Sequence, residues 1–282
     1  MILFLKVVKD HGGRVLCKAH VKSILVEDGK AAGVQMEDGT KLKAPLVVSA
    51  VGHENTRDLL DCFDQKTKDE KIMPPAPIGP SAGYLMINLG FNVSGRQAGI
   101  PCCNKMIMPS VDGDIMEATA RYRNDSKSFR PPVFITFPSV KDRAAYDKPL
   151  SCQLLTMAKY DWFEKFSDEA KEFYYSKRSG EPRGNEYAKE KEWWAKTMCE
   201  TLFEHYPQLK DHVDLMDVST PLTIEHYLNE PRGGACGLDT CPERFQWEPF
   251  QDMRVDSVPG TNYFYVKIKF YLTVQKFKQQ FD

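Results

Sequence analysis

The sequence predicts an α/β (α+β) fold with two domains, one of which contains a mixed sheet. Short segments of alternating apolar and polar residues, separated by tight turns, fill the first third of the chain and indicate strands. Strands and helices then mix, and the longest helical pattern covers 186–205. The 282 residues, 42% of them hydrophobic, are enough to bury one large core or two modest ones.

The first third predicts an apolar run, a hairpin and a central strand. Gly12-Gly13 separates the apolar run at 3–8 from the first expected strand, and Asp28-Gly29 is a tight-turn signal. The almost wholly apolar run at 46–51 is typical of a strand covered on both faces, so we expect Val47 and Val48 to be buried. The other elements expected here are strands at 14–18, 19–27 and 31–36 and a helix at 55–63.

A Pro-rich connector at 72–80 leads into the middle of the chain. We expect a surface loop at 177–185, because this segment is polar and contains Gly and Pro. The alternation near the end, from Tyr263 onward, would suit an edge strand. The remaining predicted elements are strands at 83–91, 133–138 and 152–160 and helices at 114–123 and 186–205.

Composition excludes several classes of function. The net charge is −1 with Lys and Arg spread along the chain, so no nucleic-acid partner is predicted. The first apolar run is too short for a signal-peptide core, and no stretch is long and apolar enough to cross a bilayer. The sequence contains no G-x-S-x-G, P-loop or H-E-x-x-H motif. We identify no catalytic acid or base.

The eight cysteines match no zinc or C-x-x-C pattern, so we predict no metal site and free thiols in a reducing environment. Cys102-Cys103 and the Cys236/Cys241 pair have the wrong spacing for either motif. Four other cysteines sit in apolar or amphipathic runs and are expected to be buried. These are Cys17, Cys62, Cys152 and Cys199.

Several segments, in the right order, resemble a known family. One set of residues matches a turn, hairpin and strand pattern of amine-oxidase-type flavoproteins: Gly12, Gly13, Val15, Val21, Ile24, Asp38-Gly39, Ala44, Val47, Val48, Ser49, Ala50 and Gly52. Three later segments, 131–142, 155–164 and 219–239, resemble the retinol saturase family, within the wider phytoene-desaturase and carotenoid-isomerase group. The similarity covers roughly residues 1 to 260.

The resemblance implies an FAD-binding two-domain flavoprotein fold and a set of cofactor contacts. The expected contacts with FAD are Val21, Ala50, Val51, Gly52, Arg232, Gly233, Gly234 and Gly237. His53 is expected as a loop histidine near the cofactor edge rather than a base. The implied domains are a partial FAD-binding domain at 11–71, a substrate domain at 72–218, a return to the FAD domain at 219–264 and an atypical tail at 265–282.

The chain departs from the family pattern at several points. Cys236 replaces an expected Tyr and Thr240 an expected His. No G-x-G-x-x-G turn is present to place a pyrophosphate on a helix N-terminus, and the family's closing flavin segment is absent after Gly260. We therefore expect a fragment that does not hold FAD stoichiometrically and is inactive in isolation. We also expect the loop 232–239 to lie near Gly52.

By resemblance, the parent enzyme reduces a double bond of a retinoid, with FAD as cofactor and NAD or NADP as electron donor. The resemblance also implies association with the endoplasmic reticulum membrane surface. Two alternatives stay open: a carotenoid desaturase or isomerase of the same family, and a catalytically inactive fragment. The polyene, the redox direction and the oligomeric state are not determined by the sequence. Candidate residues to line an apolar tunnel are Tyr84, Met86, Phe91, Met106, Met108, Phe134 and Phe137.

Overall fold

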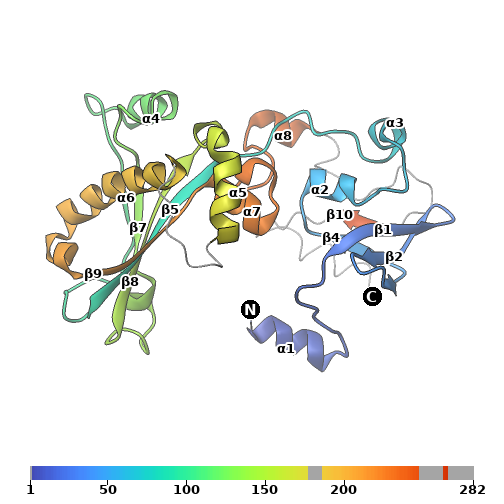
Figure 1. Cartoon of the computed structure of the whole chain (residues 1–282), viewed down its shortest axis with the longest axis horizontal. Helices are drawn as coiled ribbons and strands as arrows, with labels where there is room; N and C mark the ends of the chain where they lie inside the picture. Colours follow the sequence, from blue (N-terminus) through green and yellow to red (C-terminus); the bar gives the residue numbers. More distant parts are fainter. Residues whose placement is uncertain (1, 177–185, 248–262, 266–282) are drawn as a thin grey trace. The chain divides into compact units, whose positions relative to one another are not determined.

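In the computed structural model, which describes residues 2–176, 186–247 and 263–265, the chain divides into two units (Figure 1). Unit 1 comprises residues 1–78 and 241–282, and unit 2 comprises residues 79–240. Unit 2 is a single insertion, so the chain leaves unit 1 and returns to it once. Each unit has its own hydrophobic cluster and is described separately.

Unit 2 is built on a five-stranded sheet in which every neighbouring pair is antiparallel. Strand alternation decides which side chains enter the core. On β5, Leu85, Ile87 and Leu89 are buried, whereas the residues between them are partly or fully exposed. The strand order is β6 (Lys105–Ile107), β7 (Val133–Thr136), β8 (Pro149–Ala158), β5 (Gly83–Ser94) and β9 (Val213–Ser219).

Helices cover one side of this sheet. The long helix α6 (Glu186–His205) runs across the strands in Figure 1 and contacts β7, β8 and β9. Its fully buried Trp194 stacks on Trp162 with ring centroids 5.9 Å apart. The other α-helices of unit 2 are α4 (Ile115–Asn124), α5 (Ser167–Ser176) and α7 (Pro221–Leu228).

Local signals explain where these helices begin. At α4, the Asp114 carboxylate accepts a hydrogen bond from the Glu117 backbone N–H at 3.0 Å, as expected of an N-cap. At α7, Thr220 and Thr223 form a capping box, and the backbone is extended at Thr220, the residue before the helix. Short 3₁₀ turns connect the larger elements at Pro138–Lys141, Tyr160–Trp162, Glu164–Phe166, Pro207–His212 and Pro231–Gly233.

Unit 1 is smaller. It contains a three-stranded antiparallel sheet and a two-stranded parallel pair. Its buried hydrophobic cluster has five members, Ile24, Ala31, Leu60, Ile72 and Met73. The strands are β1 (Val21–Glu27), β2 (Lys30–Met36), β3 (Lys41–Lys43), β4 (Val47–Ser49) and β10 (Tyr263–Tyr265). The helices are α1 (Ile2–Asp10), α2 (His53–Asp58), α3 (Gln65–Thr67) with a π-turn at Lys68–Ile72, and α8 (Pro242–Gln246).

The mixture of helices and antiparallel sheets confirms the predicted α/β (α+β) class, and the hairpin, β5, β7, β8, α4 and α6 lie where the pattern predicted them. The prediction of a buried central strand at 46–51 is wrong. Val47 is partly buried against the unit 1 cluster, but Val48 is 49% exposed and Val51 is 47% exposed, so neither of these two side chains is fully covered. Among the described residues, β4 pairs with only β10. The domain assignment as flavin and substrate parts stays a prediction.

Two further expectations need correction. Residues 14–18 form no strand, and Lys18 has a φ of 55°, outside the extended region. The apolar run at 3–8, for which no element was predicted, belongs to helix α1. Cys17 and Cys62 are exposed rather than buried, whereas Cys152 and Cys199 are buried as expected. The loop at 177–185 and the tail from 266 onward lie outside the described residues.

Candidate functional site

The side of the unit 2 sheet opposite α6 carries a patterned surface that we call the open face. Strand register sets its layout, because residues paired across an antiparallel ladder point to the same face. Met86 pairs with Leu155, Leu155 with Phe134, and Phe134 with Met106. Tyr84 and Met157 form the adjoining pair on the same face.

These residues make a continuous apolar patch, defined here as Tyr84, Met86, Met106, Phe134, Leu155 and Met157. All six are partly or fully exposed, and Met106 and Met157 are 58% and 45% exposed. Single exposed apolar side chains are ordinary, but a cluster spanning four strands indicates a binding surface. Because the strand backbones are paired in the ladder, this surface offers side chains rather than free peptide groups to a ligand.

A polar row borders the apolar patch. It consists of Asp217, Asn88, Gln153 and Thr136, one residue from each of β9, β5, β8 and β7, each paired with the next across the sheet. In its centre, Gln153 Nε2 donates a hydrogen bond to Asn88 Oδ1 at 2.9 Å. At the β7 end, Lys141 Nζ donates to Thr136 Oγ1 at 2.7 Å.

The predicted tunnel residues divide between the two faces of the sheet. Tyr84, Met86, Met106 and Phe134 lie on the open face, whereas Phe91 and Phe137 are buried in the helix-covered core. Met108 lies just beyond β6 and is exposed. Sequence reasoning missed Leu155 and Met157, although the alternation of β8 marks them. It also missed the polar row, which depends on register between strands far apart in sequence.

The predicted cofactor residues of the 232–239 loop come together in unit 2, beside the start of β5. Ser81 N–H donates to Gly237 O at 2.6 Å, and Ala235 N–H donates to Ala82 O at 3.2 Å. A Cβ on Gly233 would lie 2.1 Å from Pro221 O, so this position excludes a side chain for internal packing reasons. Gly234 and Gly237 belong to the same turn, where Gly237 has a φ of 67°.

Arg232 has a specific structural role in this loop. Its guanidinium donates to Glu164 Oε1 at 3.0 Å, forms an ion pair with Asp161, and lies 4.5 Å from the centre of the Tyr160 ring. Two carboxylates therefore balance its charge. A role in cofactor binding stays a prediction.

The other predicted cofactor residues are in unit 1, at the turn between β4 and α2 and at the start of β1. Gly52 has a φ of 97° and a ψ of 163°, a region that only Gly adopts readily, while Ala50 and Val51 are exposed. Val21 begins β1 and is half-buried. Gly52 and the 232–239 loop belong to different units, so their predicted proximity stays a prediction.

The β4–α2 turn fits one part of FAD and not another. Ser49 Oγ and Thr56 Oγ1 share a hydrogen bond of 2.7 Å, and Asn55 Nδ2 donates to Val51 O at 2.9 Å, so the turn's polar side chains bond within it. The exposed Ala50 and Val51 can contact the edge of a flat ring. A pyrophosphate needs a glycine-rich helix start, and this six-residue helix does not provide one.

His53 is the buried first residue of α2 rather than a loop residue, and its predicted place near the cofactor edge stays a prediction. Its Nε2 lies 2.8 Å from Pro74 O, and its ring makes an edge contact with Trp247 at 4.9 Å between centroids. The neighbouring Arg57 is also buried, and it donates to Met73 O and to Asp69 Oδ1. These contacts join α2 to the 69–74 segment and α8, which indicates a structural role for His53.

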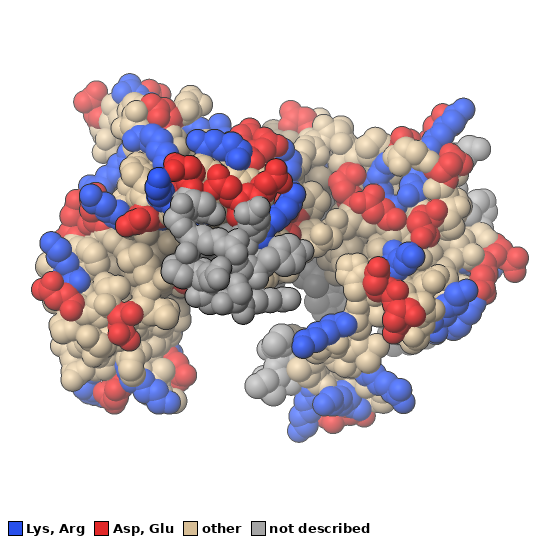
Figure 2. Space-filling model, viewed as in Figure 1, with Lys and Arg blue, Asp and Glu red and all other residues tan. Residues whose placement is uncertain are grey.

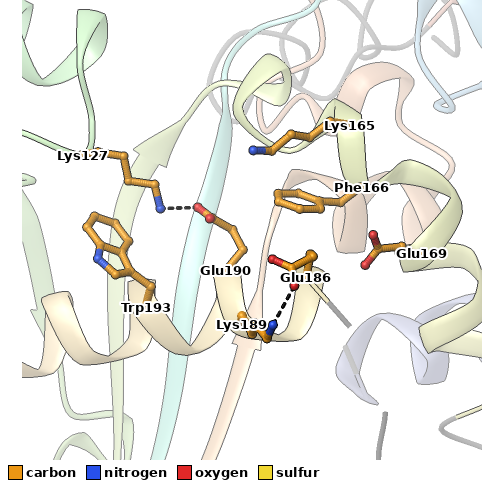
Figure 3. A pocket seen from close by; sticks show the side chains of 8 residues that line it. All are labelled: Lys127, Lys165, Phe166, Glu169, Glu186, Lys189, Glu190 and Trp193. Atoms are coloured by element: carbon orange, nitrogen blue, oxygen red, sulfur yellow. Dashed lines mark hydrogen bonds and ion pairs between the residues drawn. The ribbon is translucent and has the colours of Figure 1, made fainter. Parts of the chain in front are cut away.

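A pocket of about 600 Å³ lies between α5 and α6, and its lining is mostly charged (Figure 3). Lys127 pairs with Glu190 and lies over the Trp193 ring, and Lys189 pairs with Glu186 at 2.6 Å. The lining is completed by Lys165, Phe166 and Glu169. Because three Lys and three Glu side chains line it, this pocket suits neither an apolar ligand nor a strongly charged one.

The surface charge is mixed. Figure 2 shows Lys and Arg interspersed with Asp and Glu over the face in view, without a dominant sign. Within the described ranges, no group of three or more His, Cys, Asp or Glu side chains is arranged to hold a metal ion. None of the helices described is both long and apolar enough to span a bilayer.

Comparison with known proteins confirms the family resemblance seen in the sequence. An all-trans-retinol 13,14-reductase from Danio rerio is 30% identical over 86% of this chain and 40% of that protein. An inactive all-trans-retinol 13,14-reductase from the same organism is 27% identical over 78% of this chain and 36% of its own length. A chloroplastic prolycopene isomerase from Daucus carota is 24% identical over 79% of this chain and 32% of that protein.

A solved structure shares this fold. The structure of an oxidoreductase from Methanosarcina mazei matches with a TM-score of 0.51 and 16% identity, covering 93% of this chain and 47% of that one. No family model matches the chain. The chain spans well under half the length of the curated relatives described here.

Proposed function

We propose that this chain is part of an FAD-dependent oxidoreductase that reduces a double bond of a retinoid or a related polyene, and that the open face binds this substrate. The observation that carries the proposal is the apolar patch, which includes Met106, Phe134 and Leu155 on adjacent strands. A polyene is long, flat and apolar, and a sheet face of Met, Leu and aromatic side chains matches it in shape and polarity.

Burial of apolar surface would supply the affinity. Each Å² of apolar surface removed from water contributes about 25 cal/mol, part of which is offset by the cost of ordering the ligand. Met86, Met106 and Met157 have unbranched thioether side chains that adapt to a ligand's shape. The same contacts exclude water from the double bond that is to be reduced.

The cofactor assignment rests on the family resemblance. When bound, FAD supplies the hydride for the double bond, and NAD or NADP supplies the electrons. We propose edge contacts with the flavin nucleotide from Val21, Ala50, Val51 and Gly52. The remaining proposed contacts come from the loop that holds Arg232, Gly233, Gly234 and Gly237. An apolar substrate of this kind partitions into lipid, which supports a place at the endoplasmic reticulum membrane surface.

A substitution in the apolar patch tests this proposal. Met157→Asp places a charge on the open face, and we expect the affinity for all-trans-retinol, measured by fluorescence titration of the full chain, to fall at least tenfold, or about 1.4 kcal/mol. Met116→Asp is the matched control, since Met116 is 78% exposed on α4, outside the open face. Equal affinity in both variants, or no retinol binding by the unmodified chain, would overturn the proposal.

Flavin retention is a separate measurement. We expect the chain to lose FAD on desalting, because its sequence has no G-x-G-x-x-G turn to bind the pyrophosphate. Flavin absorbance equivalent to about one FAD per chain would contradict this expectation. The carotenoid isomerase or desaturase alternative is favoured by the Daucus carota relative. Product analysis with retinol and with lycopene-type substrates, in the presence of a reduced nicotinamide cofactor, separates the two.

A further inference from the structure

We infer that Asn88 and Gln153, the amide pair at the centre of the polar row, bind the hydroxyl group at one end of the substrate and so select an alcohol over a hydrocarbon polyene. The inference rests on the proposed function, since it concerns the same open face. It assigns the recognition of the substrate's end group to two residues of this chain.

The amide pair borders one end of the apolar patch. From Tyr84 to Asn88 the open face extends four residues along β5, which corresponds to about 13 Å. Tyr84 and Met86, with their β8 partners Met157 and Leu155, occupy this length. A ligand that lies along the patch therefore has a long apolar part over these residues and one end over the amides.

The hydrogen-bond capacity of the amide pair matches a hydroxyl group. The bond from Gln153 Nε2 to Asn88 Oδ1 leaves a donor at Asn88 Nδ2 and an acceptor at Gln153 Oε1. A hydroxyl group is both a donor and an acceptor, so it can satisfy the two together. A hydrocarbon would cover the same two groups without a hydrogen bond, at a cost of about 1–3 kcal/mol for each buried group.

The charges at the two ends of the polar row favour a neutral ligand at its centre. Asp217 lies opposite Asn88 on β9, and Lys141 bonds to Thr136 and Asn104 at the β7 end. A carboxylate ligand would be attracted towards Lys141, away from the amide pair. The neutral centre of the row therefore suits a neutral polar group best.

The test compares three ligands on the full chain: all-trans-retinol, the corresponding hydrocarbon that lacks the hydroxyl, and all-trans-retinoic acid. We expect the unmodified chain to bind retinol at least tenfold more tightly than the hydrocarbon. Gln153→Met keeps the side chain's length and removes its polar atoms. In this variant the preference should fall below about threefold, through weaker retinol binding or tighter hydrocarbon binding.

Control variants separate the inference from the proposed function. Gln208→Met changes an exposed glutamine in a 3₁₀ turn outside the sheet and should keep the preference. Two outcomes would overturn the inference: the unmodified chain shows no preference for retinol over the hydrocarbon, or Gln153→Met keeps that preference. If Met157→Asp still abolishes retinol binding in either case, the proposed function stands. Tightest binding of the acid, lost in Lys141→Met, would also overturn the inference. Absence of binding for all three ligands overturns both.

Discussion

The two units expose apolar side chains in different ways. In unit 2, the exposed apolar residues of β5, β6, β7 and β8 follow strand register and gather on the face opposite α6. In unit 1, exposed apolar residues such as Phe4 and Val48 lie on separate elements, and the buried cluster is small. A patterned apolar face on a well-packed core indicates a binding surface, whereas scattered exposure beside a small core indicates low stability.

This difference leads to a ranking of effects. Substitutions in the unit 2 core should cost most, because its large aromatic residues are fully buried. Substitutions in the small unit 1 core should act within that unit. Changes at backbone positions should cost less, and thiol reactivity should report burial without perturbing the fold.

The largest effect is expected for Trp194→Ala. Trp194 is fully buried and contacts Tyr122, Trp162 and Phe163, so its loss should reduce the free energy of unfolding by about 3–5 kcal/mol. The measurement is denaturant unfolding followed by circular dichroism. Trp193→Ala is the control, because the neighbouring Trp193 is only half-buried and its removal should cost clearly less. Equal losses would mean that the core does not centre on Trp194.

Leu60→Ala should show whether the two units unfold independently. Leu60 is fully buried in the unit 1 cluster, and its truncation should cost about 2–5 kcal/mol. We expect hydrogen exchange to speed up in β1 and β2 while β5 and β8 keep their protection. Equal loss of protection in β5 and β8 would show that the units unfold together and would remove the basis of the comparison.

A smaller effect is expected for Gly233→Ala. A Cβ at this position meets Pro221 O at 2.1 Å, and φ is 59°, so the loop must shift at a cost of about 1–3 kcal/mol. Gly99→Ala is matched in backbone angle, with a φ of 63°, but its Cβ would meet nothing within 4 Å. It should therefore cost about 1 kcal/mol or less. Thermal unfolding of both variants measures the difference, and equal costs would leave only backbone strain as the explanation.

Thiol labelling should change the stability of neither unit. Burial raises the pKa of Cys152, with a further contribution from Cys199, and burial raises the pKa of Cys199 to about 11. Both thiols therefore stay protonated and unreactive at pH 8. We expect site-resolved alkylation to modify Cys17, Cys102 and Cys236 rapidly and these two only after unfolding. Rapid modification of Cys199 in the folded chain would contradict the packing of α6.

Sequence reasoning predicted the elements whose pattern is local. The alternation of β5 and β8 and the apolar stripe of α6 each depend on residues close in sequence, and these elements lie where they were expected. It was wrong for 46–51, because whether a short apolar strand is buried depends on what packs against its two faces. The polar row could not be predicted either, since Asn88 and Gln153 meet only through the β5–β8 register.

The glycines of the 232–239 loop show a further limit. Their spacing resembled a cofactor-binding turn, and the structure gives Gly233 an internal reason to be glycine, the close approach of Pro221. A glycine selected for packing and one selected for a ligand look the same in the sequence. Only the atoms around the missing Cβ distinguish them.

The central claim is that the open face of the unit 2 sheet binds the polyene. Photo-crosslinking with a retinol analogue that carries a diazirine, followed by peptide mapping, tests it most directly. We predict adducts on strands β5, β7 and β8 at Met86, Phe134, Leu155 and Met157, and competition by unlabelled retinol. Competed adducts found instead on the charged pocket at Lys165 and Trp193, or only within unit 1, would contradict the account.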